Sequence, residues 1–418
     1  MTQLTEKKII VGLEIGTTKV VTLIGEILPN NLMNIIGMGS HKSHGIKNGE
    51  INDLKSVSKA IKNSIKKAED MAGFNISSVY LAISGKYIHY QNEIGIVPLS
   101  EKEVTKKDIK NAIYTAQSVK INNEHKILHI IPKEFSIDQK FGIKNPLGLS
   151  GIRMQVEVHL VTCNNEILKN FIKSVNNCRL KVNEVVFSGL ASNKAIITRE
   201  QKKLGVCMID IGGGTMDITI HINGFICYSS VIPYAGNMVT NDISSIFSIS
   251  KKDAEKIKIE HGCSDEQNDN KTKRIEITTF NENKIIYVEK KLLHHVIDAR
   301  YIELLNLAKN KLQIFFKTIN EKKIRKKLFA GIILTGGASK IKNLDALAKK
   351  IFKTNIEIKK SKKIEGLTEN FNTENYSTVI GLLKYGKNKI LKETKNVKNK
   401  KFFQKWFKKI NCWINKKN

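Results

Sequence analysis

Three features of the sequence predict an α/β fold in which two related lobes face a shared cleft. Strand patterns alternate with amphipathic helical patterns along 418 residues. At roughly 150 residues per domain, this length suggests two to four lobes. A strand-turn-strand pattern near the start recurs in the middle of the chain, and a further Gly-rich turn, Thr335-Gly336-Gly337, follows a strand near its end. Two copies of one device are typical of a duplicated fold.

The first copy lies within residues 8–84. Strands are predicted from KIIVGLEIG, KVVTLIGEI and MNIIGMGS, separated by turns at 16–18 and 29–31. A helix follows, for which Asp53 is a plausible N-cap and Gly73 a left-handed C-terminal cap. VYLAIS at 79–84 then predicts a buried strand. We expect residues 1–84 to begin the first core subdomain.

The pattern changes between residues 85 and 162, where short strands surround one helix that begins at Thr105. We expect this segment to be an inserted subdomain. The core pattern resumes with a helix at 165–177 and a strand at 182–187, so residues 163–203 complete the first core subdomain.

The second copy begins at residue 204 with LGVCMIDIGGG, MDITIHI and FICYSSVIPYAG. Aligning Gly212 with Gly16 gives an offset of 212 − 16 = 196, under which Asp210 matches Glu14. Residues 204–236 therefore begin a second core subdomain. Residues 237–310 are predicted to contain helices at 237–247 and 251–261, a hairpin within 262–290 and the start of a helix at 296–319. The second core is completed by 311–386, with a strand at 331–334 and helices near 342–352 and 375–386.

The Gly-rich turns suit a nucleotide triphosphate. Backbone N–H groups approach phosphate oxygens where no side chain intervenes, and a carboxylate holds Mg²⁺ through its waters. Turn amides and hydroxyls of Gly16-Thr17-Thr18-Lys19 and Gly212-Gly213-Gly214-Thr215 are placed to hold the phosphates from opposite sides. Glu14 and Asp210 supply the carboxylates. One such turn alone is more often an ordinary hairpin, but two matching copies and a third Gly-rich turn favour a nucleotide cleft.

The segments GLEIGTTK (12–19), DIGGGTMD (210–217) and LTGGAS (334–339) resemble the phosphate-1, phosphate-2 and adenosine motifs of the actin, Hsp70 and sugar-kinase superfamily. VIPYAGN (231–237), DAEKIKIEHG (253–262) and YSTVIGLLKYG (376–386) resemble the cell-division family FtsA in particular. The resemblance covers nearly the whole chain and implies an actin-like, ribonuclease H-like duplicated fold with an FtsA-type insert. In that family's terms the subdomains are 1A (1–84 and 163–203), 1C (85–162), 2A (204–236 and 311–386) and 2B (237–310).

The resemblance also implies roles for particular residues in binding ATP and Mg²⁺. The phosphate loops fall on Gly16, Thr17, Thr18 and Lys19 and on Gly212, Gly213, Gly214 and Thr215; Gly236 lies against the nucleotide, Glu255 and Lys258 near the ribose and adenine, and Gly336, Gly337 and Ser339 at the adenosine wall. Without the family context, Glu255 and Lys258 also fit a surface ion pair. The superfamily usually has Asp where this chain has Glu14, and the extra methylene puts the metal geometry in doubt.

Whether the chain hydrolyses ATP is left open, because no residue is clearly assigned to orient an attacking water. At most weak ATPase activity is expected, with ATP acting as a conformational ligand that favours head-to-tail self-association into filaments. A small-molecule, sugar-type kinase of the same superfamily is the main alternative. An Hsp70-type chaperone is excluded by length, because only 418 − 386 = 32 residues follow Gly386.

The formal net charge of +31 raises the question of nucleic-acid binding. Only six of the 70 basic residues are Arg, and the other 64 are Lys scattered along the chain. Base-reading interfaces favour Arg for its bidentate fork, so we expect a solvated Lys surface and no nucleic-acid partner. The six Cys show no metal-ligand spacing and are expected to be reduced. No apolar run approaches the ~18 residues of a membrane span, so the chain is expected in the cytoplasm.

The last 18 residues predict a membrane-targeting helix behind a basic linker at 387–400. At ~100° per residue, seven apolar side chains of 401–418 fall within an arc of roughly 140°. They are Phe402, Phe403, Trp406, Phe407, Ile410, Trp413 and Ile414. Lysines flank the arc, which suits an anionic bilayer surface. A helix that packs back on its own domain is the alternative.

The resemblance implies a partner as well. FtsA proteins bind the C-terminal tail of the tubulin-like division protein FtsZ, and Arg300 and Glu303 match positions implicated in that contact. An Arg fork suits a peptide carboxylate. The expected function is thus an ATP-binding protein that tethers the FtsZ ring to the cytoplasmic face of the inner membrane at the division site, as a peripheral protein, and helps other division proteins assemble there.

Overall fold

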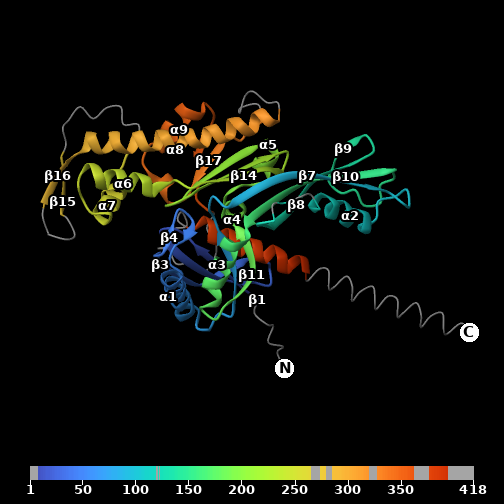
Figure 1. The fold of residues 1–418 in the computed structure, drawn as a ribbon, viewed down its shortest axis with the longest axis horizontal. Helices are drawn as coiled ribbons and strands as arrows, with labels where there is room; N and C mark the ends of the chain where they lie inside the picture. The colour runs from blue at the N-terminus through green and yellow to red at the C-terminus, as the bar shows by residue number, and fades with distance from the viewer. Residues whose placement is uncertain are drawn as a thin grey trace, which may run out of the picture.

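A computed structural model describes residues 8–118, 121, 123–264, 274–278, 285–319, 327–361 and 376–393. Two five-stranded sheets form the cores of two lobes, and a four-stranded sheet extends to one side of them (Figure 1). Helices cover the outer faces of both lobes. This arrangement confirms the predicted duplicated α/β fold.

The sheet of the first lobe has the order β11-β6-β1-β2-β3. Its strands are β1 (Lys8–Ile15), β2 (Lys19–Ile27), β3 (Met33–Lys42), β6 (Ser78–Ile83) and β11 (Lys181–Phe187). Helices α1 (Leu54–Ala72) and α3 (Asn165–Asn176) pack together on one face. The predicted caps of α1 are confirmed: the Asp53 side chain accepts from the backbone N–H groups of residues 55 and 56, and Gly73 has a φ of 78°. The short strands β4 (Ile46–Lys47) and β5 (Glu50–Ile51) pair with each other.

The sheet of the second lobe has the order β14-β13-β12-β17-β18, which repeats the topology of the first. Its strands are β12 (Val206–Ile211), β13 (Met216–Ile222), β14 (Phe225–Ile232), β17 (Ile332–Thr335) and β18 (Ile356–Ile358). Strand β12 runs antiparallel to β13 and parallel to β17, as β1 does to β2 and β6. The predicted repeat is therefore confirmed. Strand β18 was not predicted, because three residues with one half-buried side chain give no periodic signal.

Residues between the strands of the first lobe form the side sheet, with the order β7-β10-β8-β9. Its elements are β7 (Ile88–Pro98), α2 (Lys106–Gln117), β8 (His125–Ile137), β9 (Lys140–Ile143) and β10 (Arg153–Asn164). The predicted start of α2 is confirmed, since Thr105 and Asp108 form a reciprocal capping box.

The second lobe bears a group of helices. They are α6 (Gly236–Ile246), α7 (Lys251–His261) and α8 (Lys290–Thr318), with the hairpin β15 (Arg274–Thr278) and β16 (Ile285–Glu289) beside them. Helix α8 begins six residues earlier than the predicted residue 296, because Leu293 is fully buried and the start has no side-chain cap that the sequence could show. Helices α4 (Ser188–Ile196), α5 (Arg199–Leu204), α9 (Leu344–Phe352) and the 3₁₀ turn η2 (Gly337–Lys340) complete the elements.

A last helix spans residues 377–393, red in Figure 1, and so runs seven residues beyond its predicted end at 386. Gly386 does not end it. A Cβ there would lie 2.8 Å from Ile10 Cγ2 and from Tyr80 Cε2, so this glycine permits close packing on the first sheet. The remainder of the predicted linker, 394–400, and the predicted membrane helix, 401–418, lie outside the described residues.

Two further sequence expectations bear on the described part of the chain. Its five cysteines are all free, as predicted, and Cys163, Cys207 and Cys263 are buried. None of the helices found among the described residues is long and apolar enough to cross a membrane. The boundaries of the subdomains stay a prediction.

Candidate functional site: a cleft between two glycine turns

Each lobe contributes one turn of the same geometry. After β1, the N–H of Gly16 donates to the Lys19 carbonyl at 3.0 Å. After β12, the N–H of Gly212 donates to the Thr215 carbonyl, also at 3.0 Å. These residues correspond under the offset of 196 found in the sequence, so the repeat extends to individual backbone hydrogen bonds.

The two turns face each other so closely that only glycine fits. A Cβ on Gly213 would lie 2.2 Å from Thr18 Cγ2, and a Cβ on Gly214 would lie 2.3 Å from Thr17 Oγ1. Contacts this short do not occur between non-bonded atoms, so a larger residue would have to displace the facing threonine side chain or the turn itself. Backbone N–H groups without a side chain in the way are what phosphate oxygens need.

Two adjoining cavities open at these turns. The first has about 750 Å³ of empty space and is lined by residues of both turns and of the third Gly-rich turn. It brings together Glu14, Gly16, Thr17, Thr18, Lys19, Asp210, Gly212, Gly213, Gly214, Thr215, Gly336 and Gly337. The second has about 1120 Å³ and adds Gly236, Glu255 and Lys258.

Ser339 is the one predicted nucleotide residue that lines neither cavity. It is buried, and its hydroxyl donates to the Gly336 carbonyl at 2.8 Å. It therefore holds the shape of the third turn, and its contact with adenosine stays a prediction.

Three carboxylates line the first cavity, one more than the two that the sequence predicted to hold Mg²⁺. Glu14 and Asp210 are next to last in the equivalent strands β1 and β12, and Asp217 on β13 pairs directly with Asp210 across the sheet. The pKa of Glu14 is raised to about 7, chiefly by burial; the charge of Lys19 lowers it and the charge of Asp210 raises it. Burial likewise raises the pKa of Asp210 and Asp217. Asp217 is the last residue of the DIGGGTMD motif. Its position on the strand next to that of Asp210 could have identified it from the sequence as a third carboxylate of the site.

Mg²⁺ fits this set of donors. The Oε2 atom of Glu14 is buried and has no hydrogen-bond partner among the described residues. Such an atom costs free energy unless something binds it. Oxygen ligands with several negative charges are what Mg²⁺ takes in proteins. The extra methylene of Glu14 relative to Asp does not keep its carboxylate out of the cavity.

Because the folded pKa of Glu14 is about 7 and its ordinary value is 4.5, its ionisation opposes folding. The stability that the protonated form contributes is present below about pH 4.5 and is lost as pH rises through 7. Glu14→Gln is therefore expected to stabilise the nucleotide-free protein at pH 8 by up to about 3 kcal/mol, and to change it little at pH 5. Urea unfolding at both pH values measures this. The exposed Glu101→Gln is the control, and equal effects of Glu14→Gln at the two pH values would contradict the prediction.

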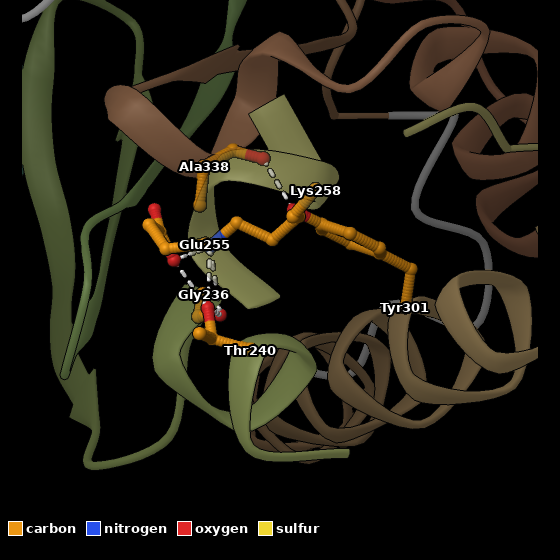
Figure 2. A network of polar contacts seen from close by, with 6 residues as sticks. All are labelled: Gly236, Thr240, Glu255, Lys258, Tyr301 and Ala338. Carbon is orange, nitrogen blue, oxygen red and sulfur yellow. Dashed lines mark hydrogen bonds and ion pairs between the residues drawn. The ribbon is translucent and has the colours of Figure 1, made fainter. Parts of the chain in front are cut away.

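Lys258, which lines the second cavity, is the centre of a second group of contacts (Figure 2). Its Nζ donates to Glu255 Oε2 at 2.6 Å, to Thr240 Oγ1 at 2.7 Å and to the Gly236 carbonyl at 3.3 Å. Lys258 is only 6% exposed, and burial lowers its pKa. The alternative of a surface ion pair does not fit a buried lysine that joins α6 to α7.

Helix α8 reaches the same region through Tyr301. This side chain is fully buried and its hydroxyl donates to the Ala338 carbonyl at 2.6 Å (Figure 2). Ala338 follows the third Gly-rich turn and lines the second cavity with Gly236 and Tyr301. Helices α6 and α8 therefore both touch the wall of the cleft.

Arg300 and Glu303 line neither of the two cavities. The guanidinium of Arg300 donates two hydrogen bonds to the carboxylate of Asp242 on α6, of 2.5 and 2.9 Å. It donates a third, of 2.5 Å, to Glu303. Asp242 could not be identified from the sequence, because no local pattern links residues 58 positions apart.

Two sheets of one topology, with facing glycine turns and buried carboxylates, define an actin-like protein with a cleft between its lobes. Solved structures support this class. The chain is similar to one in a "PilM-PilN type IV pilus biogenesis complex", with a TM-score of 0.63 and 16% identity, over 90% of this chain and 98% of that one. It is also similar to MreB5 of Spiroplasma citri bound to AMPPNP, with a TM-score of 0.51 and 18% identity, over 94% and 99% of the two chains.

Sequence comparisons give the family. The model described as "Cell division protein FtsA" matches residues 207–381, and "SHS2 domain inserted in FTSA" matches residues 85–162. FtsA of Buchnera aphidicola subsp. Schizaphis graminum (strain Sg) is 52% identical over 410 residues, 98% of each chain. FtsA of Escherichia coli (strain K12) is 45% identical over 418 residues, all of both chains. The chain belongs to the FtsA family of cell division proteins.

Proposed function

We propose that this chain binds Mg²⁺–ATP between its two lobes and tethers FtsZ to the cytoplasmic membrane during division. The observation that supports the nucleotide best is the pair of equivalent glycine turns, whose glycines lie against the threonines of the opposite turn. The proposed ATP residues are the fourteen predicted from the sequence, of which all but Ser339 line the two cavities.

Within this proposal each group has a physical task. The amides of both turns bind phosphate oxygens, Lys19 neutralises the terminal phosphates, and Glu14 and Asp210 hold Mg²⁺, which screens the triphosphate charge when bound. Gly236 and the buried Lys258 with Glu255 border the larger cavity, where the ribose and adenine fit. No residue is assigned to orient an attacking water, so we propose at most slow hydrolysis. The main consequence of nucleotide binding is then self-association of the protein.

The membrane contact is proposed for residues 401–418, from their sequence alone. Seven apolar side chains on one arc and flanking lysines suit an anionic surface. This places the protein at the inner face of the membrane as a peripheral protein, where other division proteins assemble. The basic segment before it would let the folded lobes stand off the surface.

The FtsZ contact is proposed for Arg300 and Glu303 on α8. Arg300 already holds a carboxylate, Asp242, in a bidentate grip. This contact with Asp242 supports a carboxylate-binding role, and a peptide carboxylate would have to share the guanidinium with Asp242 or replace Asp242.

Arg300→Glu is expected to lower the affinity for an FtsZ tail peptide at least about 30-fold, because it replaces the carboxylate-binding fork with a like charge. Fluorescence anisotropy of a labelled peptide measures this. Arg153→Glu, at an exposed position of the side sheet, is the control. Since Arg300→Glu also leaves Asp242 without its partner, Asp242→Asn tests whether loss of that pair alone matters. Unchanged peptide affinity in Arg300→Glu would remove the assignment.

The tether as a whole is tested by mixing the full chain, the labelled FtsZ tail peptide and anionic vesicles. The peptide is expected to sediment with the vesicles only when the chain is present, and not with Arg300→Glu. A chain that binds peptide and vesicles separately, but never both together, would contradict the tether.

A further inference from the structure

The start of the last helix lies inside the phosphate cleft. Ser377 and Thr378 line the first cavity and are 4% and 5% exposed. The Ser192 hydroxyl of α4 connects this helix to the site, since it donates to Asp210 Oδ2 at 2.6 Å and shares a 3.1 Å hydrogen bond with the Thr378 hydroxyl. Burial raises the pKa of Asp210 and of Glu14, and the hydroxyls of Ser377 and Thr378, respectively, lower these pKa values. Neither residue belongs to the three Gly-rich turns, and the family resemblance assigned them no role.

The residue before this helix contacts the phosphate lysine. Lys19 Nζ lies 4.1 Å from the centre of the Tyr376 ring, within the range of a cation–π contact. Burial lowers the pKa of Lys19, and the nearby charges of Glu14 and Asp210 raise it. Residues 376, 377 and 378 therefore lie beside Lys19, Glu14 and Asp210, the charged groups proposed above to bind the terminal phosphates and Mg²⁺.

The last helix packs against its neighbours by its backbone, which suits it to transmit a displacement. A Cβ on Gly381 would lie 1.8 Å from the Ala191 carbonyl of α4, and one on Gly12 would lie 3.1 Å from the Val379 carbonyl. The helix is thus in direct backbone contact with α4 on one side and with β1 on the other. Its far end is held by Glu184, which accepts from Tyr385 at 2.6 Å and also from Lys389. Close-packed elements shift as units.

We propose that Tyr376, Ser377 and Thr378 form a sensor that distinguishes a nucleoside triphosphate from a diphosphate. This inference rests on the proposed nucleotide site. The terminal phosphate takes Lys19 from the Tyr376 ring, because a charged hydrogen bond to phosphate is stronger than a partly exposed cation–π contact. A diphosphate presents no group at that position and leaves Lys19 on the ring. The last helix then takes a different position in the two states, and it leads directly to the C-terminal segment of the chain.

Hydrogen exchange of the full-length protein tests the sensor. Backbone amides of residues 376–386 are compared without nucleotide, with Mg²⁺–ADP and with Mg²⁺–AMPPNP. We expect AMPPNP to slow exchange there at least about threefold relative to ADP. Equal exchange with the two nucleotides, both shown to be bound, would overturn the inference while leaving the nucleotide site intact.

Substitutions of Tyr376 distinguish a specific effect of its ring on the nucleotide response from a general effect on the fold. Tyr376→Phe keeps the ring and is expected to behave as the parent protein. Tyr376→Leu removes the competitor for Lys19, so AMPPNP affinity relative to ADP is expected to rise about fivefold, and the AMPPNP-specific change in exchange is expected to disappear. Tyr114→Leu, 71% exposed on α2, is the matched control.

Persistence of the AMPPNP-specific change in Tyr376→Leu would overturn the role of the ring. Loss of that change in both Tyr376→Leu and Tyr114→Leu would overturn it as well, since the effect would not be local. If the parent protein bound neither nucleotide, the proposed nucleotide site itself would be wrong, and the sensor with it.

Discussion

A chain that ends at Lys400 is expected to lose its sedimentation with anionic vesicles, whereas the full chain sediments with them. Burial of one large apolar side chain contributes ~1.5 to 3 kcal/mol, and each basic residue near an anionic surface contributes ~1 kcal/mol. Halving these values for shallow insertion still leaves several kcal/mol from seven apolar and several basic side chains. Truncation should therefore lower vesicle binding at least about 100-fold.

The tail offers its own optical probe, because both tryptophans of the chain, Trp406 and Trp413, lie in it. A blue shift of their emission with anionic vesicles, and none with neutral ones, is expected of the full chain. Ile410→Glu on the apolar arc should abolish the shift, and Cys412→Glu, off the arc, should weaken it far less. Equal sedimentation of the full and truncated chains would show that the tail does not anchor the protein.

Gly336→Ala is expected to lower the affinity for Mg²⁺–ATP at least about 100-fold. Gly336 has φ 92° and ψ 166°, a region that is essentially restricted to glycine. A Cβ there would lie 2.3 Å from Asp210 Oδ1 and 2.5 Å from the Ile211 carbonyl. The third turn would have to move away from the strand that holds the proposed metal carboxylate. Calorimetric titration with Mg²⁺–ATP measures the loss.

Gly224 provides a matched control for this substitution. It has the same φ of 92°, in the turn between β13 and β14, but a Cβ there would meet nothing closer than Lys203 Cγ at 3.8 Å. Gly224→Ala therefore also places a Cβ at positive φ, but without a clash, and should cost about 1 kcal/mol of stability while leaving ATP affinity unchanged. Equal loss of ATP affinity in both variants would attribute the effect to general destabilisation.

The sequence predicted the core of the fold because its signals are local. Asp53 and Gly73 cap their helix as expected, and the match of Gly212 to Gly16 extends to the same backbone hydrogen bond in each turn. The match of Asp210 to Glu14 likewise placed the two carboxylates in one cavity. The repeated pattern was informative because the two copies of a duplicated strand-turn-strand unit tend to face each other across a shared site.

The missed residues depend on contacts between distant segments. Asp242 was not identified because its partner, Arg300, lies 58 residues away. Tyr376 stands before a helix whose pattern indicated only packing, and its contact with Lys19 exists because the chain returns to the first lobe. The end of that helix was misplaced because Gly386 resembles a stop signal, although its role is close packing. Such relations have no periodicity along the chain.

Titration of the purified full chain with Mg²⁺–ATP tests most directly whether the two turns close on a triphosphate. The account predicts one nucleotide bound per chain, with affinity that falls when Mg²⁺ is removed, because Glu14 and Asp210 would then face the phosphates without a cation between them. A correctly folded chain that binds no adenine nucleotide would contradict it.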